Sequence, residues 1–260
     1  MIAERYITEW SKSFPWTKNS FVEQDMVICR ALVDIFGDPY LSDALAFRGG
    51  TAIHKLHFKP QVRYSEDIDL VQVEPGPVKP IAERLGEVLS WLPRKSFDLR
   101  RFGFRMRFRY ESEVPPVEPM RLKIEVNTYE HFSVLGYVST PFDMQSSWFS
   151  GSCKLKTYSL NELMGTKLRA LYQRKKGRDL FDLNLALSRV DAPTIVRVWR
   201  EYMRFRDCEV PSAKQFAANM DEKMSLNDYI GDVEPLLRSG VTFNPHEAYV
   251  EFKKKVLPLI

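Results

Sequence analysis

The sequence predicts an α+β fold, in which a mixed sheet flanked by helices is followed by a mainly helical lobe. Two observations predict it. Short apolar or alternating segments are interspersed with helical ones up to about residue 158, and helical periodicity alone follows to the C-terminus. The 260 residues, 44% of them hydrophobic, suffice for one large domain or two modest ones. We therefore expect an α+β domain over residues 1–158 and a helical lobe over residues 159–260.

In the first half of the chain, the spacing of hydrophobic residues predicts the helices and strands, and glycine and proline residues mark where they end. Residues 21–36 have the apolar spacing of a helix, which Gly37, Asp38 and Pro39 end. The expected elements that follow are a strand at 45–47, a helix at 51–58, a strand at 67–73, a helix at 78–92, a strand at 97–110, a strand at 121–127 and further short strands within 134–157.

The second half begins with a helix-start signal. Ser159 and Glu162 have the spacing of a capping box, so a helix is expected from there, with Gly177 as its stop. A second helix is expected over 179–187, and helical patterns continue to the C-terminus.

Composition and charge exclude several classes of protein. No apolar run approaches the roughly 18 residues of a membrane span, and no secretory signal core is visible, so a cytoplasmic protein is expected. The three cysteines are scattered, which speaks against a disulfide framework or a zinc knuckle. The net charge of +4 permits a nucleic-acid partner without demanding one.

Two aspartates two residues apart are the first candidates for chemistry. Alternation in a strand places Asp67 and Asp69 on one face, with Ser65 beside them. Upstream, Gly49 and Gly50 precede a short helix and allow a close backbone approach to a phosphate. Paired carboxylates beside an anion site suit a divalent metal that meets a nucleoside triphosphate. Two solvated aspartates at a strand end are the alternative.

A third carboxylate is expected on the strand at 121–127. Glu125 faces the same way as Lys123 and Asn127, opposite the apolar residues of that strand. If this strand lies beside that of Asp67, three acids converge and can hold metal ions. An exposed strand face with a Lys123–Glu125 ion pair is the alternative.

The helical half offers a lysine and an aspartate. Lys167 can serve as a point charge for a triphosphate, and Asp182 can orient it. The residues alone favour a simpler interpretation. In it, Lys167 is solvated, and Asp182 caps a helix or pairs with Arg178.

An arginine-rich strand is the candidate RNA surface. Its arginines alternate with aromatic residues and so share one face, where they repel one another unless anions lie between them. An RNA backbone and acidic side chains of the same fold are equally consistent sources of that negative charge. The residues are Arg101, Arg105, Arg107 and Arg109.

These motifs resemble the signature of the AbiEii/AbiGii toxin nucleotidyltransferases, which belong to type IV toxin–antitoxin and phage-defence systems and to the DNA polymerase β-like superfamily. The resemblance covers roughly residues 21–190, in the family's motif order. Glu125 stands where the family more usually has aspartate, and the last ~70 residues match only as a helical tail. The matching segments are Glu23–Asp25, Gly49–Ala52, Arg63–Leu70, Lys123–Asn127 and Glu162–Leu183.

The resemblance implies transfer of a nucleotide from an NTP to an acceptor, with Mg²⁺ or Mn²⁺ as cofactor. The acceptor implied is RNA, above all the 3′ end of tRNA, whose modification would stop translation and growth, and a cognate antitoxin is the implied regulator. By the same resemblance, Asp67 and Asp69 would bind metal with Glu125 as a third ligand, and Lys167 and Asp182 would complete the catalytic site. The nucleotide-binding residues implied are Gly49, Gly50, Thr51, Ser65 and Lys123.

Three competing functions share parts of this pattern. A transferase acting on a protein side chain would have the same metal site and a different acceptor surface. A two-metal nuclease would also cluster acids but would need no NTP. A binding module without activity would keep the fold, but the intact pair Asp67 and Asp69 speaks against it.

Overall fold

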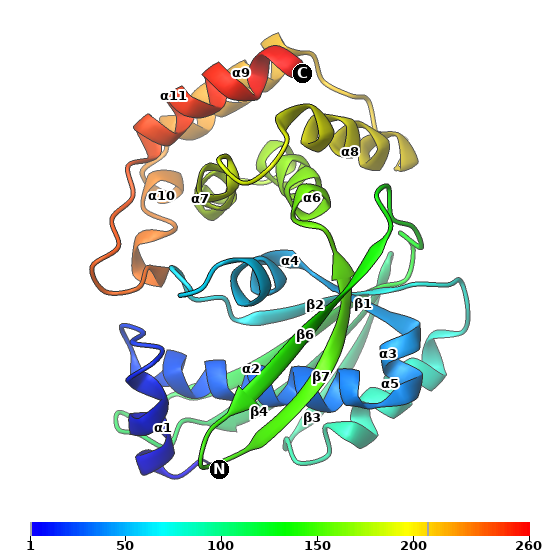
Figure 1. Cartoon of the computed structure of the whole chain (residues 1–260), viewed down its shortest axis with the longest axis vertical. Coiled ribbons are helices and arrows are strands. Elements are labelled where there is room, and N and C mark those ends of the chain that lie inside the picture. The colour runs from blue at the N-terminus through cyan, green and yellow to red at the C-terminus, as the bar shows by residue number, and fades with distance from the viewer. Residues whose placement is uncertain (1, 207) are drawn as a thin grey trace. The chain divides into compact units, whose positions relative to one another are not determined.

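A seven-stranded mixed sheet in the order β3-β4-β5-β2-β1-β7-β6 forms the centre of the first of two units (Figure 1). The computed structural model describes residues 2–206 and 208–260. The first unit comprises Met1–Phe132 and Tyr137–Tyr158, and the second comprises Ser133–Gly136 and Ser159–Ile260. The predicted α+β fold class is confirmed. Residues 133–136, which the sequence assigned to the first domain, belong instead to the second unit.

The sheet is mixed because two of its strand pairs are parallel. β2 runs parallel to β5, and β1 runs parallel to β7, whereas the other neighbours are antiparallel. The strands are β1 (Leu45–Arg48), β2 (Asp67–Gln72), β3 (Lys95–Arg100), β4 (Gly103–Glu111), β5 (Pro119–Asn127), β6 (Tyr137–Gln145) and β7 (Ser150–Tyr158).

Helix α2 fills one side of the sheet and provides most of the buried apolar surface there. It is in contact with β5, β6 and β7, and fourteen of its nineteen residues are buried. Ile68, Phe104 and Ile124 of the sheet are also buried, and removal of such apolar side chains from water stabilises the unit. The helices are α1 (Glu4–Ser11), α2 (Asn19–Gly37), α3 (Pro39–Ala44), α4 (Gly49–Ala52), continued by a π-helical segment (Ile53–His57), and α5 (Val78–Val88).

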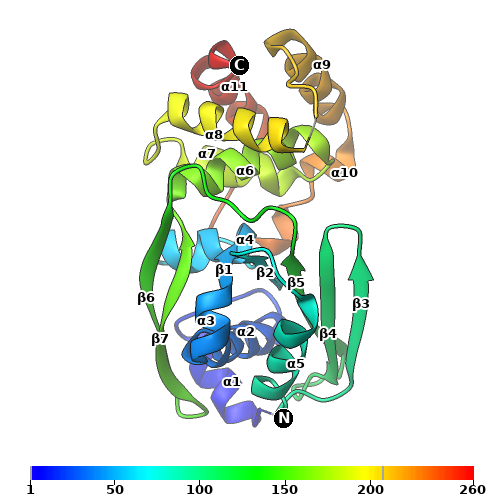
Figure 2. The same ribbon diagram turned by 90° about the vertical axis from the view of Figure 1, so that its right-hand side faces the viewer.

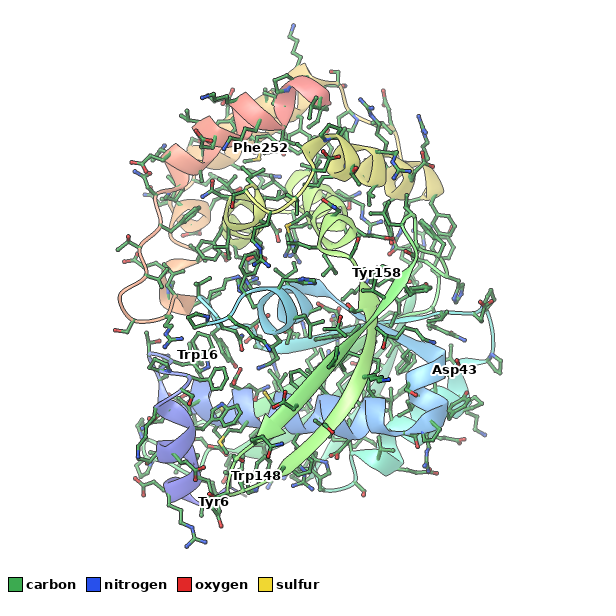
Figure 3. All side chains as sticks on the ribbon, in the orientation of Figure 1. Tyr6, Trp16, Asp43, Trp148, Tyr158 and Phe252 are labelled. Atoms are coloured by element: carbon green, nitrogen blue, oxygen red, sulfur yellow. The ribbon has the colours of Figure 1, made fainter. Side chains whose placement is uncertain are left out.

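The second unit contains helices and short turns (Figure 2). α6 packs against α7 and α8, and α11 packs against α7 and α9. Phe252 on α11 lies at its core, with its ring centroid 5.4 Å from that of Phe216 (Figure 3). The helices are α6 (Leu160–Gln173), α7 (Gly177–Ala186), α8 (Ala192–Phe205), α9 (Ala213–Met224), α10 (Asn227–Ile230) and α11 (Pro245–Lys255).

The expected single strand at 97–110 is wrong, because the chain turns back within it. β3 and β4 form a hairpin whose last pair is Arg100 with Gly103, so only Arg101 and Phe102 make the turn. Gly103 has φ of +150°, and a Cβ there would lie 1.9 Å from the carbonyl oxygen of Val126. Neither turn residue is glycine or asparagine, so the usual hairpin signal is missing.

Two further predictions need correction. Gly177 does not end a helix; it begins α7, where a Cβ would lie 2.0 Å from the carbonyl oxygen of Tyr229. The capping box at Ser159 is half formed. Ser159 accepts a hydrogen bond from the Glu162 N–H, but the Glu162 carboxylate accepts from Ser133 Oγ, from the backbone of residues 134 and 135, and from the Tyr202 hydroxyl. These bonds explain why residues 133–136 belong to the second unit.

Among the helices that the structure describes, none is long and apolar enough to cross a membrane.

Candidate functional site

The two candidate aspartates lie on one face of β2, as the alternation predicted. Ile68 and Leu70 between and after them are buried on the opposite face, toward the core. The parallel neighbour β5 places Lys123 beside Asp67 and Glu125 beside Asp69. The polar face of β2 therefore continues onto β5 without interruption.

Ion pairs connect these side chains. Lys123 Nζ lies 2.5 Å from Asp67 Oδ2 and 3.5 Å from Glu125 Oε1. Arg105, the antiparallel partner of Glu125 on β4, lies 2.5 Å from the same Oε1. Glu125 is thus paired with two cationic side chains. The ion pair between Lys123 and Glu125, which was the alternative to a metal site, is present.

Three carboxylates do not form one metal site here. Within residues 2–206 and 208–260, no group of three or more His, Cys, Asp or Glu side chains is placed to hold a metal ion. Glu125 lies in the predicted row but is paired with Arg105 and Lys123. The geometry leaves Asp67 and Asp69 as a two-carboxylate site.

The protonation preferences of the carboxylates differ because their surroundings differ. The pKa of Asp67 is raised to about 6, mainly by burial and to a smaller extent by the neighbouring Asp69, although Lys123 acts in the opposite direction. For Glu125, burial is outweighed by Lys123 and Arg105, which together hold its pKa below the ordinary value. The pKa values of Asp67 and Glu125 are therefore shifted in opposite directions.

The glycine pair packs directly against the aspartate strand. Gly49 has φ of +80°, and a Cβ there would lie 2.1 Å from Asp69 Oδ2. A Cβ on Gly50 would lie 2.8 Å from a guanidinium nitrogen of Arg63 and 3.1 Å from Ser65 Oγ. At Gly49 both the positive φ and the Asp69 side chain favour glycine, whereas a Cβ at Gly50 would have to displace the end of the Arg63 side chain.

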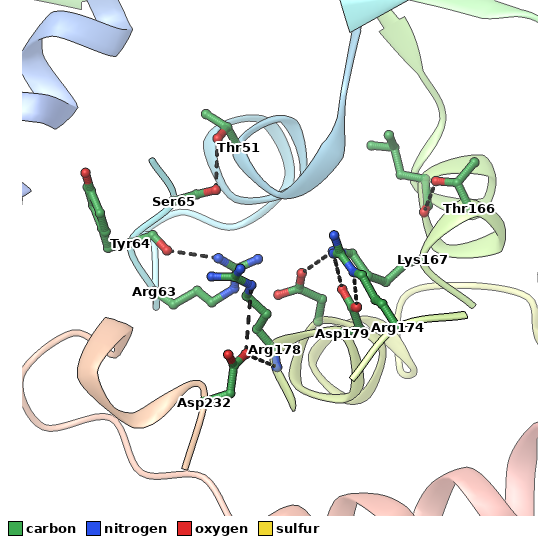
Figure 4. A network of polar contacts seen from close by, with 12 residues as sticks. Thr51, Arg63, Tyr64, Ser65, Thr166, Lys167, Arg174, Arg178, Asp179 and Asp232 are labelled. Atoms are coloured by element: carbon green, nitrogen blue, oxygen red, sulfur yellow. Dashed lines mark hydrogen bonds and ion pairs between the residues drawn. The ribbon is translucent and has the colours of Figure 1, made fainter. Parts of the chain in front are cut away.

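Two hydroxyl groups link the glycine segment to the start of β2. Thr51 Oγ1 lies 2.9 Å from Ser65 Oγ and 2.5 Å from the carbonyl oxygen of Asp67 (Figure 4). Arg63 is buried and donates to the Tyr64 carbonyl at 2.9 Å. The structure thus brings the predicted residues Thr51, Ser65 and Asp67 together.

A cavity of about 290 Å³ lies beside Asp69 and contains a cluster of arginines. Of the four predicted RNA-binding arginines, Arg101 and Arg105 line it. Arg107 forms an ion pair with Asp98, and Arg109 is exposed elsewhere on β4. The lining also includes Arg48, Arg100, Phe102, Glu125 and Asn127.

Sequence reasoning missed Arg48 and Arg100 as members of this cluster. Arg48 follows the β1 apolar run directly and pairs with Asp69 across the two strands. Its guanidinium also forms a 2.6 Å ion pair with the buried Glu130. Arg100 directly precedes the predicted Arg101, but the hairpin that places it at the end of β3 was not predicted.

In the second unit, Lys167 is buried between two carboxylates. Its Nζ lies 2.9 Å from Asp179 Oδ1 and 3.0 Å from Asp182 Oδ2, and both aspartates are inaccessible to solvent (Figure 4). Arg174 makes two further bonds to Asp179, at 2.6 and 2.7 Å. The solvated Lys167 of the alternative interpretation is excluded by this burial, and Asp182 is paired with Lys167.

Asp179 and Arg174 lie in the segment that resembles the family's third motif, but neither was predicted as a catalytic residue. Although burial raises the pKa of Asp179, Lys167 and Arg174 hold it below the ordinary value. Asp179 and Asp182 are three residues apart on α7 and so share a helix face, a spacing that could have identified the pair.

Comparison with protein families gives a match over most of the chain. The model of the nucleotidyl transferase AbiEii toxin of the type IV toxin–antitoxin system matches residues 30–251. A search of curated proteins found no match.

Two solved structures show the same fold at low sequence identity. The nucleotidyltransferase toxin MenT4 from Mycobacterium tuberculosis H37Rv has a TM-score of 0.62 and 17% identity, with all of this chain and 90% of that chain covered. The protein JHP933 from Helicobacter pylori has a TM-score of 0.53 and 17% identity, with all of this chain and 93% of that one covered.

Proposed function

Because the chain belongs to the AbiEii family of nucleotidyltransferase toxins of type IV toxin–antitoxin systems, we propose that it transfers a nucleotide from an NTP to RNA. The proposed target is the 3′ end of tRNA, where an added nucleotide would prevent aminoacylation and so stop translation and growth. Membership of the family also implies a cognate antitoxin.

The observation that carries the RNA proposal is the arginine cluster beside Asp69. Arg48, Arg100, Arg101 and Arg105 line one cavity with that aspartate, and guanidinium groups bind phosphate oxygens in a bidentate manner. Phe102 in the same lining offers a face on which a base can stack. Because Arg48 and Arg105 already form ion pairs with Glu130 and Glu125, the RNA proposal depends mainly on Arg100 and Arg101.

Asp67 and Asp69 are the proposed ligands of Mg²⁺ or Mn²⁺. Their donor set fits, because Mg²⁺ in nucleotide enzymes is commonly bound by one or two carboxylates, substrate phosphates and water. The space that Gly49 leaves beside Asp69 and the raised pKa of Asp67 fit it as well. When bound, such an ion neutralises phosphate charge and activates the attacking hydroxyl.

The other residues of the first unit are proposed to hold the nucleotide. Gly49 and Gly50 allow the backbone to approach a phosphate, and Ser65 and Thr51 present hydroxyl groups at the same place. Lys123 is paired with Asp67. When a metal ion binds that carboxylate, the Lys123 ammonium group can form an ion pair with a phosphate oxygen instead. The roles of Lys167 and Asp182 as catalytic residues are proposed from the family's third motif alone.

The test is incubation with each labelled NTP, Mg²⁺, total tRNA and a cell extract as a source of protein acceptors. Label should enter tRNA with the wild type and not with Asp67→Ala. Label in a protein band instead would favour transfer to a protein side chain. RNA shortened without NTP would indicate a nuclease, and no label at all would contradict the tRNA proposal.

A charge reversal tests the acceptor surface. Arg101→Glu, in the cavity lining, should weaken tRNA binding by tenfold or more and lower its salt dependence. Arg109→Glu makes the same change on an exposed residue of β4 outside that lining and should have a smaller effect. Equal losses in the two variants would contradict the assignment of the cavity to the acceptor.

A further inference from the structure

We infer that Gln24 is a positioning residue for the metal-binding carboxylate Asp67. Its side-chain amide joins β2 and β5 at the end of the sheet where Asp67 and Lys123 lie. The inference rests on the proposed function insofar as Asp67 is taken to bind the metal ion.

The two bonds from Gln24 reach two neighbouring parallel strands. Its Nε2 donates to the Glu66 carbonyl at 3.3 Å and to the Arg121 carbonyl at 3.1 Å. Glu66 directly precedes Asp67, and Arg121 lies two residues before Lys123, the strand partner of Asp67. One amide nitrogen thus joins the strands immediately before the pair that forms the 2.5 Å ion pair.

The orientation of the amide is fixed by its partners. Carbonyl oxygens only accept hydrogen bonds, so the NH₂ group must face Glu66 and Arg121. The Tyr110 hydroxyl on β4 donates to the opposite atom, Gln24 Oε1. The Gln24 side chain is 2% exposed, its bond with Tyr110 is buried, and its two bonds to the strand carbonyls are partly buried.

Glu66 needs such a partner because the strand ladder does not include it. The pairing of β2 with β5 begins at Asp67 and Lys123, one residue after Glu66. The Gln24 bond therefore holds the backbone one residue before the point at which the β2–β5 pairing begins. An apolar side chain at position 24 would also leave two carbonyl oxygens without this donor.

The position of Asp67 depends on this backbone for a second reason. Asp67 is the first residue of β2, and its carboxylate and its carbonyl oxygen both make contacts, with Lys123 and Thr51 respectively. Residues that hold metal ligands in place typically change metal affinity or activity by 10–100-fold when they are replaced.

The test measures Mn²⁺ binding directly, from the electron paramagnetic resonance signal of free Mn²⁺, with no reaction in progress. Gln24→Met, similar in size, should weaken Mn²⁺ binding by roughly tenfold or more and lower kcat to a comparable degree, with a smaller change in KM for the NTP. Tyr110→Phe is the matched control. It removes the third bond of Gln24 and leaves both strand carbonyls bound, so Mn²⁺ binding should stay within about twofold of wild type.

Melting temperatures separate positioning from general destabilisation. If Gln24→Met does not fold, Gln24→Glu retains the shape without the NH₂ donors and should show the same loss of Mn²⁺ affinity. Wild-type Mn²⁺ binding in a folded Gln24 variant would overturn the inference, as would an equal loss in Tyr110→Phe.

Asp67→Ala distinguishes this failure from a failure of the proposed function. If Asp67→Ala loses Mn²⁺ and Gln24→Met does not, only the role of Gln24 is wrong. If Asp67→Ala binds Mn²⁺ as the wild type does, Asp67 is not a metal ligand. Both the proposed metal site and the role of Gln24 are then wrong.

Discussion

Gly49 lies where backbone conformation and the absence of a side chain both matter. Its φ of +80° is one that residues with a Cβ rarely adopt, and the Asp69 carboxylate occupies the space that a Cβ would need. A single glycine therefore determines where the second aspartate of the pair can lie.

We predict that Gly49→Ala loses both activity and stability. The alanine must displace Asp69, and a misplacement of about 1 Å in a catalytic group can lower a rate by about 100-fold. Gly240→Ala is the control, because Gly240 has a φ of +81° but nothing within 4 Å of its Cβ position. Both variants should lose about 1–2 kcal/mol of unfolding free energy to backbone strain, and only Gly49→Ala should lose nucleotide transfer. Unchanged transfer in a folded Gly49→Ala would contradict this reading.

For single residues, the sequence predicted that Asp67 and Asp69 lie on the same face of a strand. It did not predict which cationic side chains lie beside the carboxylates. Alternation is local, so Asp67 and Asp69 could be placed from five consecutive residues. The partners of Glu125 depend on strand order and on the alignment of three strands, which no local pattern encodes. For the same reason the burial of Lys167 between two aspartates of another helix could not be predicted.

Among the elements, α2 is unusual because three consecutive polar residues near its start are buried. Glu23, Gln24 and Asp25 are each at most 2% exposed. Each makes contact with a different part of the first unit. Glu23 accepts from the Glu113 N–H, Gln24 binds two strands, and Asp25 pairs with Lys55 at 2.8 Å. The helix was predicted from its apolar spacing, and its polar side was not.

Glu23 makes the stability of this helix depend on pH. Burial raises the pKa of Glu23 to about 7, and its Oε1 has no hydrogen-bond partner. The folded state therefore keeps a proton that the unfolded chain has already released, so this residue lowers stability as pH rises from about 4.5 to about 7.

We predict that Glu23→Gln stabilises the protein at pH 8 more than at pH 5.5. A glutamine keeps an acceptor for the Glu113 N–H and has no proton to release, so the gain at pH 8 should be on the order of 2 kcal/mol. Urea unfolding of both proteins at the two pH values measures it. A gain independent of pH would show that Glu23 titrates normally in the folded state.

The β3–β4 hairpin shows the limit of prediction at the level of elements. The alternation of β4 was recognised, but it was extended backward through the turn because Arg101 and Phe102 continue the alternating pattern. Arg101 was therefore expected on a strand face. In the structure it lies in the hairpin turn and lines the cavity beside Asp69. The error at the element level thus changed which arginines are candidates for RNA contact.

For the whole molecule, the division into two units predicts that a substitution that destabilises one unit can leave the stability of the other unchanged. The second unit contains the buried network of Lys167, Arg174, Asp179 and Asp182, and the first contains the aspartate strand. Removing the lysine leaves two buried carboxylates with Arg174 as the cation bound to Asp179, which typically costs about 3–5 kcal/mol.

We predict that Lys167→Met lowers the hydrogen-exchange protection of α6 and α7 and leaves that of β2 and β5 unchanged. Lys175→Met is the control, because the exposed Lys175 pairs with an equally exposed Glu222 and contributes little to stability. Hydrogen exchange read by mass spectrometry reports each segment separately. Equal loss of protection in β2 and β5 would mean that the two units unfold together.

The contribution of Ser133–Gly136 to the second unit has a consequence for synthesis on the ribosome. β1 obtains its parallel neighbour when β7 emerges, so the sheet can close once residue 158 has left the exit tunnel. Ser133, by contrast, must wait for Glu162, and Glu162 itself is bound by Tyr202, forty residues later. A nascent chain cut short between these points would contain the aspartate strand but not the bonds that attach residues 133–136 to the second unit.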